Sequence, residues 1–99
     1  MIDILRVDEN GVTKATFPDP DALHQLLDDH VQADSCCLRF IDLYGDTTFN
    51  RLQLHVLASE LRAAAAGGSQ VLRERVEALA AFVEETGAEP HHSIKLIGD

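Results

Sequence analysis

The segment from Cys36 to Asn50, CCLRFIDLYGDTTFN, constrains the fold more than any other part of the chain. Its first half is β-prone and carries apolar side chains on both alternating faces, which is the pattern of a strand covered on both sides. We therefore expect residues 36–43 to form a strand in the middle of a sheet. Tyr44-Gly45-Asp46 predicts a tight turn after this strand, and Thr47–Phe49 is expected to return as a short second strand.

Three stretches show the period of amphipathic helices. Asp19 and Pro20 form a helix start, because the carboxylate accepts free amides and proline needs no donor, so the first helix is expected over residues 20–31. A second helical stretch begins near Leu54 and stops at Gly67-Gly68, and a third follows Ser69, so the two form an antiparallel helical hairpin. The expected buried stripes are Leu23, Leu26, Leu27 and Val31 in the first helix, Leu54, Leu57, Ala58, Leu61 and Ala65 in the second, and Leu72, Val76, Leu79 and Val83 in the third.

Strands are expected at both ends of the chain. Ile2–Asp8 and Val12–Phe17 flank Glu9-Asn10-Gly11, and Asn-Gly is a strong signal for a β-hairpin. The terminal HHSIKLIGD alternates apolar and polar residues and predicts a last strand beside residues 36–43. The element order is therefore ββαβ(β)ααβ. This order predicts a single α+β domain over residues 1–99, in which three helices pack on a mostly antiparallel sheet made of a hairpin, a central strand and a C-terminal strand.

The chain is strongly acidic, with a formal net charge of −9 over 99 residues. Residues 1–50 hold ten acids against three bases, and residues 51–99 hold seven against five. A negative field repels phosphate backbones, so nucleic-acid binding is not expected, and it steers encounters with a basic partner. The alternative is that the charge only keeps the protein soluble. The sequence shows no secretory signal and no run approaching 18 apolar residues, so we expect a cytoplasmic protein without membrane association.

Polar residues that suit chemistry gather within nine positions, at Asp42, Tyr44, Asp46, Thr47 and Asn50. Two carboxylates flanking a tyrosine suit acid–base work or a hard cation. The same residue types are also typical of any turn and any strand. The structural interpretation is therefore favoured over catalysis, with partner contact between the two.

His91 and His92 are the next candidates. Adjacent histidines in an extended segment diverge, and so do the adjacent Cys36 and Cys37, so neither pair predicts a metal site. The cysteines are expected to be reduced, with one or both buried. Phosphate-binding and hydrolase motifs are absent from the sequence, and no cofactor is indicated. A small metal-dependent or acid–base enzyme using Asp42, Asp46 and His91 or His92 remains an alternative.

The segments LRFIDLYGDTTFN and SIKLIGD resemble small uncharacterised bacterial proteins that carry an RF-D-YGDT-FN segment and end in KFIGD-like residues. The resemblance covers the middle and the end of the chain and transfers no activity. In size and acidity the chain is also similar to immunity proteins, which neutralise a toxin by binding it. This second likeness is an analogy.

The leading hypothesis is a non-enzymatic binding module of the immunity or antitoxin type, which docks a basic protein partner. In this hypothesis, buried Tyr44 or Phe49 anchors the interface, and acidic side chains steer the encounter. A self-associating structural module, including a homodimer, is a further alternative. The predicted partner-binding residues are Asp28, Asp29, Asp42, Tyr44, Asp46, Thr47 and Asn50.

Overall fold

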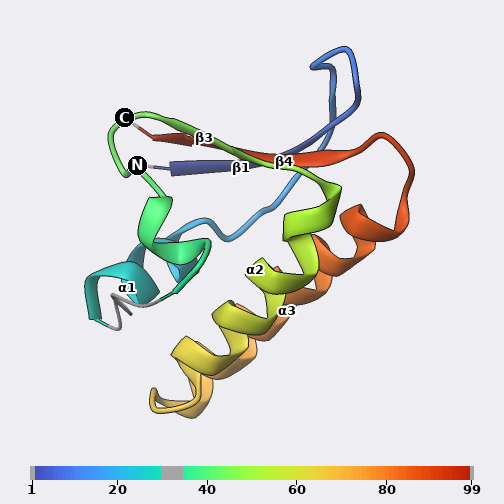
Figure 1. Ribbon diagram of the computed structural model, residues 1–99. Helices are drawn as coiled ribbons and strands as arrows, with labels where there is room; N and C mark the ends of the chain where they lie inside the picture. The colour runs from blue at the N-terminus through green and yellow to red at the C-terminus, as the bar shows by residue number, and fades with distance from the viewer. Residues whose placement is uncertain (1, 30–34, 99) are drawn as a thin grey trace.

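Four strands form one antiparallel sheet in the computed structural model, which describes residues 2–29 and 35–98 (Figure 1). The strands are β1 (Ile2–Val7), β2 (Thr13–Thr16), β3 (Asp46–Phe49) and β4 (Ser93–Gly98), in the order β2-β1-β4-β3. The two ends of the chain therefore supply the two central strands, which pair from Ile2 opposite Gly98 to Val7 opposite Ser93.

The two central strands are amphipathic with a period of two. Ile2 and Ile4 of β1 and Ile94 and Leu96 of β4 are buried, and the residues between them are more exposed. Successive side chains of a strand point to opposite faces, so these four build one apolar face of the sheet. That face forms one side of the hydrophobic core.

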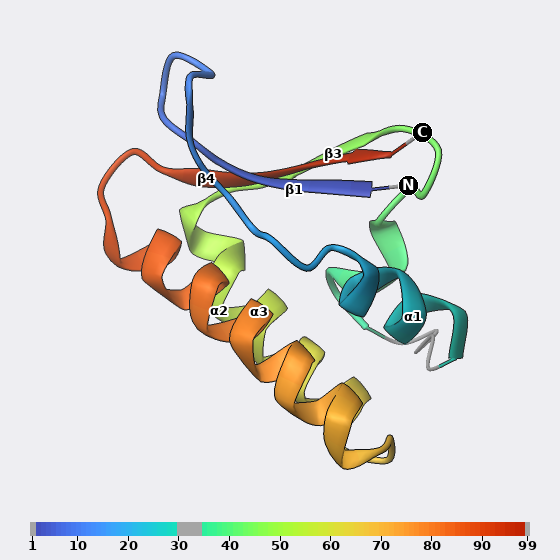
Figure 2. The ribbon, with the colours of Figure 1, turned by 180° about the vertical axis from the view of Figure 1, so that it is seen from behind.

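Three helices cover this face and leave the other face of the sheet open, as the two opposite views show (Figures 1 and 2). They are α1 (Asp21–Asp29), α2 (Arg51–Ala65) and α3 (Gln70–Ala88), and a short 3-10 helix, η1 (Leu38–Phe40), precedes β3. The described residues contain no helix long and apolar enough to cross a membrane. The helices α2 and α3 run antiparallel, so the predicted helical hairpin is confirmed.

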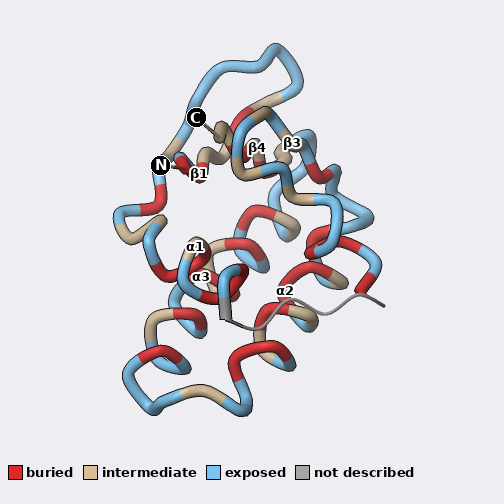
Figure 3. The backbone as a smooth tube through the Cα atoms, turned by 90° about the vertical axis from the view of Figure 1, so that its left-hand side faces the viewer, coloured by how far each residue is buried: buried red, intermediate tan, exposed pale blue. Residues whose placement is uncertain are grey.

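Local capping explains where the long helices begin. The Asn50 side chain accepts hydrogen bonds from the backbone N–H groups of Leu52 and Gln53, and the Gln53 side chain accepts one from the Asn50 N–H. This reciprocal arrangement is a capping box. Ser69 caps α3 by accepting from the Leu72 N–H at 3.1 Å. Buried and exposed positions then alternate along both helices with a helical period (Figure 3).

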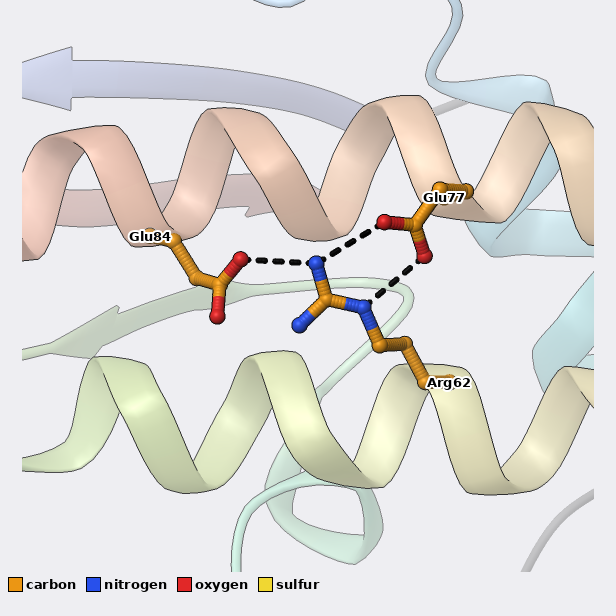
Figure 4. Close-up of polar contacts among 3 residues, drawn as sticks. All are labelled: Arg62, Glu77 and Glu84. Atoms are coloured by element: carbon orange, nitrogen blue, oxygen red, sulfur yellow. Dashed lines mark hydrogen bonds and ion pairs between the residues drawn. The ribbon is translucent and has the colours of Figure 1, made fainter.

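Two arginines tie the helical layer together by ion pairs. Arg62 of α2 binds Glu77 through two hydrogen bonds of 2.8 and 2.9 Å and Glu84 at 2.7 Å, both on α3 (Figure 4). The hydrogen bonds that Arg62 donates to Glu84 and Glu77 raise its pKa further above its usual range. Arg75 of α3 holds both carboxylate oxygens of Asp19 at 2.8 Å, which fixes the start of α1 against α3.

The core between sheet and helices is closed. A void of about 10 Å³ lies between the sheet and the helices and is lined by apolar side chains, among them Ile4, Leu57 and Leu79. This void is no larger than one water molecule needs.

The α+β class, the antiparallel sheet and the three helices are confirmed, and the element order agrees with the prediction. The predicted central strand over residues 36–43 is wrong, because that segment forms a bend, η1 and a turn. The strand between α1 and α2 is β3, the short strand predicted at Thr47–Phe49, and it lies at the edge of the sheet. The C-terminal strand takes the central place instead. Of the predicted first helix, residues 30–31 lie outside the described residues.

The predicted N-terminal hairpin is present, but its turn is longer than a two-residue Asn-Gly connection. The Asp8 carboxylate accepts the backbone N–H groups of Asn10 and Val12, both at 2.9 Å, and Gly11 adopts a positive φ of 79°. The Val12 hydrogen bond is the main cause that lowers the pKa of Asp8. The side chain of Asp8 therefore organises the turn.

Candidate functional site

The aromatic side chains divide into a buried set and an exposed pair. Phe17, Phe49 and Phe82 belong to the core or pack against it. Phe40 is 60% exposed and ends η1, and Tyr44 is 83% exposed and lies between η1 and β3. Large apolar side chains that gather on one exposed segment mark a candidate interaction surface. We call residues 39–46 the aromatic turn.

One carboxylate fixes the segment that leads into the aromatic turn. Glu60 of α2 accepts three backbone N–H groups, from Cys36 at 2.5 Å, Cys37 at 2.8 Å and Leu38 at 3.1 Å. Burial by itself would raise the pKa of Glu60, but the three donors and the nearby Arg39 outweigh it and hold the pKa below its usual range. These amides face a carboxylate instead of a neighbouring strand, which is why residues 36–43 do not join the sheet.

The two cysteines of this segment differ in exposure. Both are free thiols, with Cys36 exposed and Cys37 buried, as predicted for a reduced pair with at least one buried member. Burial, the charge of Glu60 and the neighbouring Cys36 together raise the pKa of the Cys37 thiol. Cys37 is therefore a packing residue with a poorly reactive sulfur.

The residues around Tyr44 hold the turn in one conformation. Asp42 accepts the Tyr44 N–H at 2.9 Å through its carboxylate and donates its own N–H to the Thr47 hydroxyl at 3.1 Å. Gly98 of β4 donates its N–H to the Gly45 carbonyl at 2.8 Å. A Cβ atom on Gly45 would lie 2.6 Å from the Asp42 carboxylate, so a side chain there would displace that carboxylate. Asp42 and Thr47 therefore act first as parts of the turn.

The C-terminal segment SIKLIG packs directly against the segment LRFIDLYGDTTFN. A Cβ atom on Gly98 would lie 2.5 Å from the backbone carbonyl of Leu43, so only glycine allows the two backbones to approach. Tyr44 has no such role. Among the described residues its side chain makes no hydrogen bond, ion pair or ring contact, and it is the most exposed of the large hydrophobic residues.

Phe40 is accompanied by a cation. The guanidinium of Arg39 lies 4.7 Å from the centre of the Phe40 ring, which is cation–π geometry. The sequence pattern placed Arg39 and Phe40 inside a buried strand and assigned no contact to Glu60. It therefore did not identify any of the three as part of a site. No local pattern identifies Glu60, because its partners lie more than twenty positions earlier in the chain.

The other predicted residues near the turn take separate places. Asp46 is exposed and lies 3.9 Å from the Lys95 ammonium. Asn50 is an exposed helix cap. Phe49 is 3% exposed and belongs to the core, so the prediction that it anchors an interface is corrected by its burial. Thr47 is half-buried beneath the turn.

The predicted acidic surface of α1 is only partly described. Asp28 is exposed and lies 3.1 Å from His24 Nε2, one helical turn earlier. Asp29 is the last residue of α1, and its side chain lies outside the described residues. Asp28 and Asp29 lie on α1, and the other five predicted partner-binding residues lie between positions 42 and 50.

The histidines predicted for an enzyme site lie away from the aspartates. The pairing of Asp46 with Ile97 and of Phe49 with Ile94 places His91 and His92, which precede β4, at the opposite end of β3 from the turn. The strand spacing alone separates these ends by roughly 10 Å. Over residues 2–29 and 35–98, no three His, Cys, Asp or Glu side chains gather in a way that would hold a metal ion.

A shallow hollow lies beside these histidines. It is lined by residues 50–52 and 91–93, at the start of α2. His92 buries an Nδ1 atom without a hydrogen-bond partner, and His91 adopts a positive φ of 63°. The hollow is open to solvent and holds none of the predicted aspartates, so the four-residue catalytic set is not assembled.

Comparison of the chain with models of protein families, with curated proteins and with solved structures finds no match. The candidate site is therefore defined by its own geometry. It consists of an exposed tyrosine and an arginine-stacked phenylalanine on a turn that is fixed from both sides.

Proposed function

We propose that this protein is a small acidic binding module that captures a basic protein partner through the aromatic turn, in the manner of an immunity or antitoxin protein. The observation that carries the proposal is the position of Tyr44. It is 83% exposed on a turn in which Asp42, Gly45 and Thr47 hold the backbone in place. The hydrogen bonds that hold this turn do not use the Tyr44 side chain, so the side chain is available to a partner.

The rigidity of the turn favours binding. Ordering a loop at an interface costs free energy, and a loop that is already ordered avoids most of that cost. The residues just before the aromatic turn are fixed to α2 through Glu60, and the turn itself is fixed to β4 through Gly98. Tyrosine and arginine are also the residue types most enriched among side chains that dominate binding energy. Tyr44 and Arg39 are therefore suitable anchors.

The net charge of the whole chain favours a basic partner. Asp42 precedes Tyr44 by two positions and Asp46 follows it by two, and both are exposed. Arg39 and Lys95 lie near these carboxylates, so the attraction comes mainly from the net charge of −9 over the whole chain. Such a surface accelerates association with cations and repels acidic proteins.

A crosslinker placed at the anchor tests the proposal. A photoreactive phenylalanine at position 44 should trap a basic protein when irradiated in the cells that produce this protein. The same group at position 71 of α3, where Val71 is 65% exposed, should trap none of it. The trapped protein, once purified, should bind Tyr44→Ala at least tenfold more weakly than wild type and bind Val71→Ala unchanged.

The charge contribution is tested separately from the anchor. Asp46→Asn should slow association at low salt and leave the dissociation rate nearly unchanged, because exposed charges act mainly on the encounter. Asp28→Lys reports whether the acidic surface of α1 also takes part. The proposal fails if position 44 traps the same proteins as position 71, or if Tyr44→Ala binds the trapped protein as tightly as wild type.

A further inference from the structure

On the side of β3 that faces away from β4, the backbone N–H and C=O groups form no hydrogen bonds with any other described strand. The Gly98 N–H donates to the Gly45 carbonyl at 2.8 Å, so these two residues occupy a hydrogen-bonded position of the ladder, joined by this one bond because the Gly45 N–H donates to the Asp42 carbonyl. Such pairs alternate with non-bonded pairs along an antiparallel ladder. Because Asp46 pairs with Ile97 and Thr48 with Lys95, both of these are non-bonded pairs. The N–H and C=O groups of Asp46 and Thr48 therefore point away from β4, toward the edge of the sheet.

These edge groups are accessible. Asp46 and Thr48 are exposed, and their side chains share the face of the sheet opposite to the buried Phe49. All three helices lie on the Phe49 side of the sheet, so they leave the Asp46 side uncovered (Figures 1 and 2). An added strand would find two donors and two acceptors in register. Tyr44 stands just before this strand, and the 73% exposed Leu52 stands just after it.

The opposite edge of the sheet is protected in a way that β3 is not. On β2, the register with β1 shifts between Arg6 and Val7, and Lys14 lies within the strand. Bulges and edge lysines are the usual devices that prevent a strand from accepting another chain. By contrast, β3 keeps a continuous register with β4 and contains no lysine or proline, and its protection is limited to its length of four residues and the charge of Asp46.

We infer that β3 is a docking strand, along which an extended basic segment of the protein partner adds as a fifth strand through the main chain of Asp46 and Thr48. This inference rests on the proposed function and specifies how the partner binds. Charge selects the occupant. A second copy of this chain would bring a further −9 and a second Asp46 to the same edge, whereas a basic segment is attracted.

Amide hydrogen exchange on the whole labelled protein tests the inference directly. In the free protein the amides of Thr47 and Phe49 should exchange slowly and those of Asp46 and Thr48 rapidly. The probe is a blocked hexapeptide of alternating lysine and valine. When it binds at low salt, exchange at Asp46 and Thr48 should slow at least tenfold. The same peptide with glutamate in place of lysine should leave exchange unchanged.

Two matched variants separate strand addition from contact with side chains. Thr48→Pro removes an outward donor without removing a hydrogen bond to β4, and should weaken binding of the lysine peptide at least tenfold. Thr16→Pro is its control, because Thr16 is exposed on the β2 edge in a non-bonded pair with Leu5, next to the hydrogen bond from Phe17 to Ile4. If Thr48→Pro does not fold, N-methylation of the Thr48 amide in a semisynthetic chain removes the same donor.

Each outcome has a distinct meaning. Slowed exchange at Asp46 and Thr48 that Thr48→Pro abolishes and Thr16→Pro preserves supports the inference. A lysine peptide that shifts Tyr44 resonances but leaves both amides fast overturns strand addition, while the proposed function stands. No binding at millimolar peptide also overturns it, as does a dimer in light scattering with both amides protected. Loss of the specific crosslink at position 44 would instead remove the proposed function.

Discussion

Replacing Glu60 by glutamine keeps the size of the side chain and removes the charge that holds the aromatic turn. One oxygen can still accept from Cys37 and Leu38, but the other becomes an amide group facing the Cys36 N–H. A hydrogen bond to a charged acceptor contributes roughly 1.5–3 kcal/mol and one to a neutral acceptor roughly 0.5–1.5 kcal/mol. One bond is lost and two are weakened, while water compensates part of the loss at this partly exposed site. We therefore expect Glu60→Gln to lower the free energy of unfolding by about 2 kcal/mol.

Urea unfolding at pH 7 measures this change as a lower midpoint with an unchanged slope. For a chain of this length, the same loss lowers the melting temperature by about 10 °C. Glu74→Gln is the matched control, because Glu74 is exposed and contacts only the Gln70 side chain among the described residues. Its effect should stay within about 0.5 kcal/mol.

The pH dependence gives an independent check on the same contact. The pKa of Glu60 lies below its ordinary value of 4.5, so the carboxylate stabilises the fold fully above that pH. This contribution is lost as the pH falls through the lowered pKa of the folded state. The stability gap between wild type and Glu60→Gln should therefore be complete at pH 7 and shrink as the pH falls below 4.5. A gap at pH 7 no larger than that of Glu74→Gln, or one that does not shrink on acidification, would refute the reasoning.

Three further predictions follow from the packing. Gly98→Ala places a methyl group against the backbone of the aromatic turn and should cost about 1–3 kcal/mol in urea unfolding, whereas Gly67→Ala, which has open space around it, should cost almost nothing. Thiol titration of the native protein should show one rapid equivalent from Cys36, with Cys37 reacting only after unfolding, and two rapid equivalents would contradict its burial. Arg62→Gln should lower the melting temperature at pH 7, and this loss should shrink as the pH falls below 4.5, because protonation of its two glutamate partners, whose pKa values it holds below their usual range, removes the same ion pairs.

The proposed anchor lies on the aromatic turn, and the proposed docking strand, β3, follows it directly. Tyr44 supplies an anchor whose loss weakens binding to the partner, and β3 supplies the direction along which the partner extends. Glu60 takes part in neither contact. Its substitution should nevertheless weaken binding, because a loosened turn must be ordered again when the partner arrives. A Glu60→Gln protein that binds the trapped partner as tightly as wild type would show that the rigidity of the turn is unimportant.

The sequence alone determined the helical layer. Apolar residues at spacings of three and four define the buried faces of α1, α2 and α3, and Ser69 and Gly67-Gly68 mark the connection between the last two. These signals are local, because a helix makes its backbone hydrogen bonds within four residues and its caps within three. The same holds for the hairpin and for the alternating residues of β4, whose type was predictable although their place in the sheet was not.

The conformation of residues 36–46 depends on contacts with distant parts of the chain. Their β-prone composition predicted a central strand, but a carboxylate on α2 binds the amides that a strand would have used. β propensity is a weak preference that depends on available neighbours, and the middle of the sheet is taken by the two ends of the chain. The sequence located the polar cluster around Tyr44. The contact with Glu60 and the close approach of Gly98 to Leu43 join residues far apart in the chain, and these long-range contacts expose Tyr44 on a fixed turn.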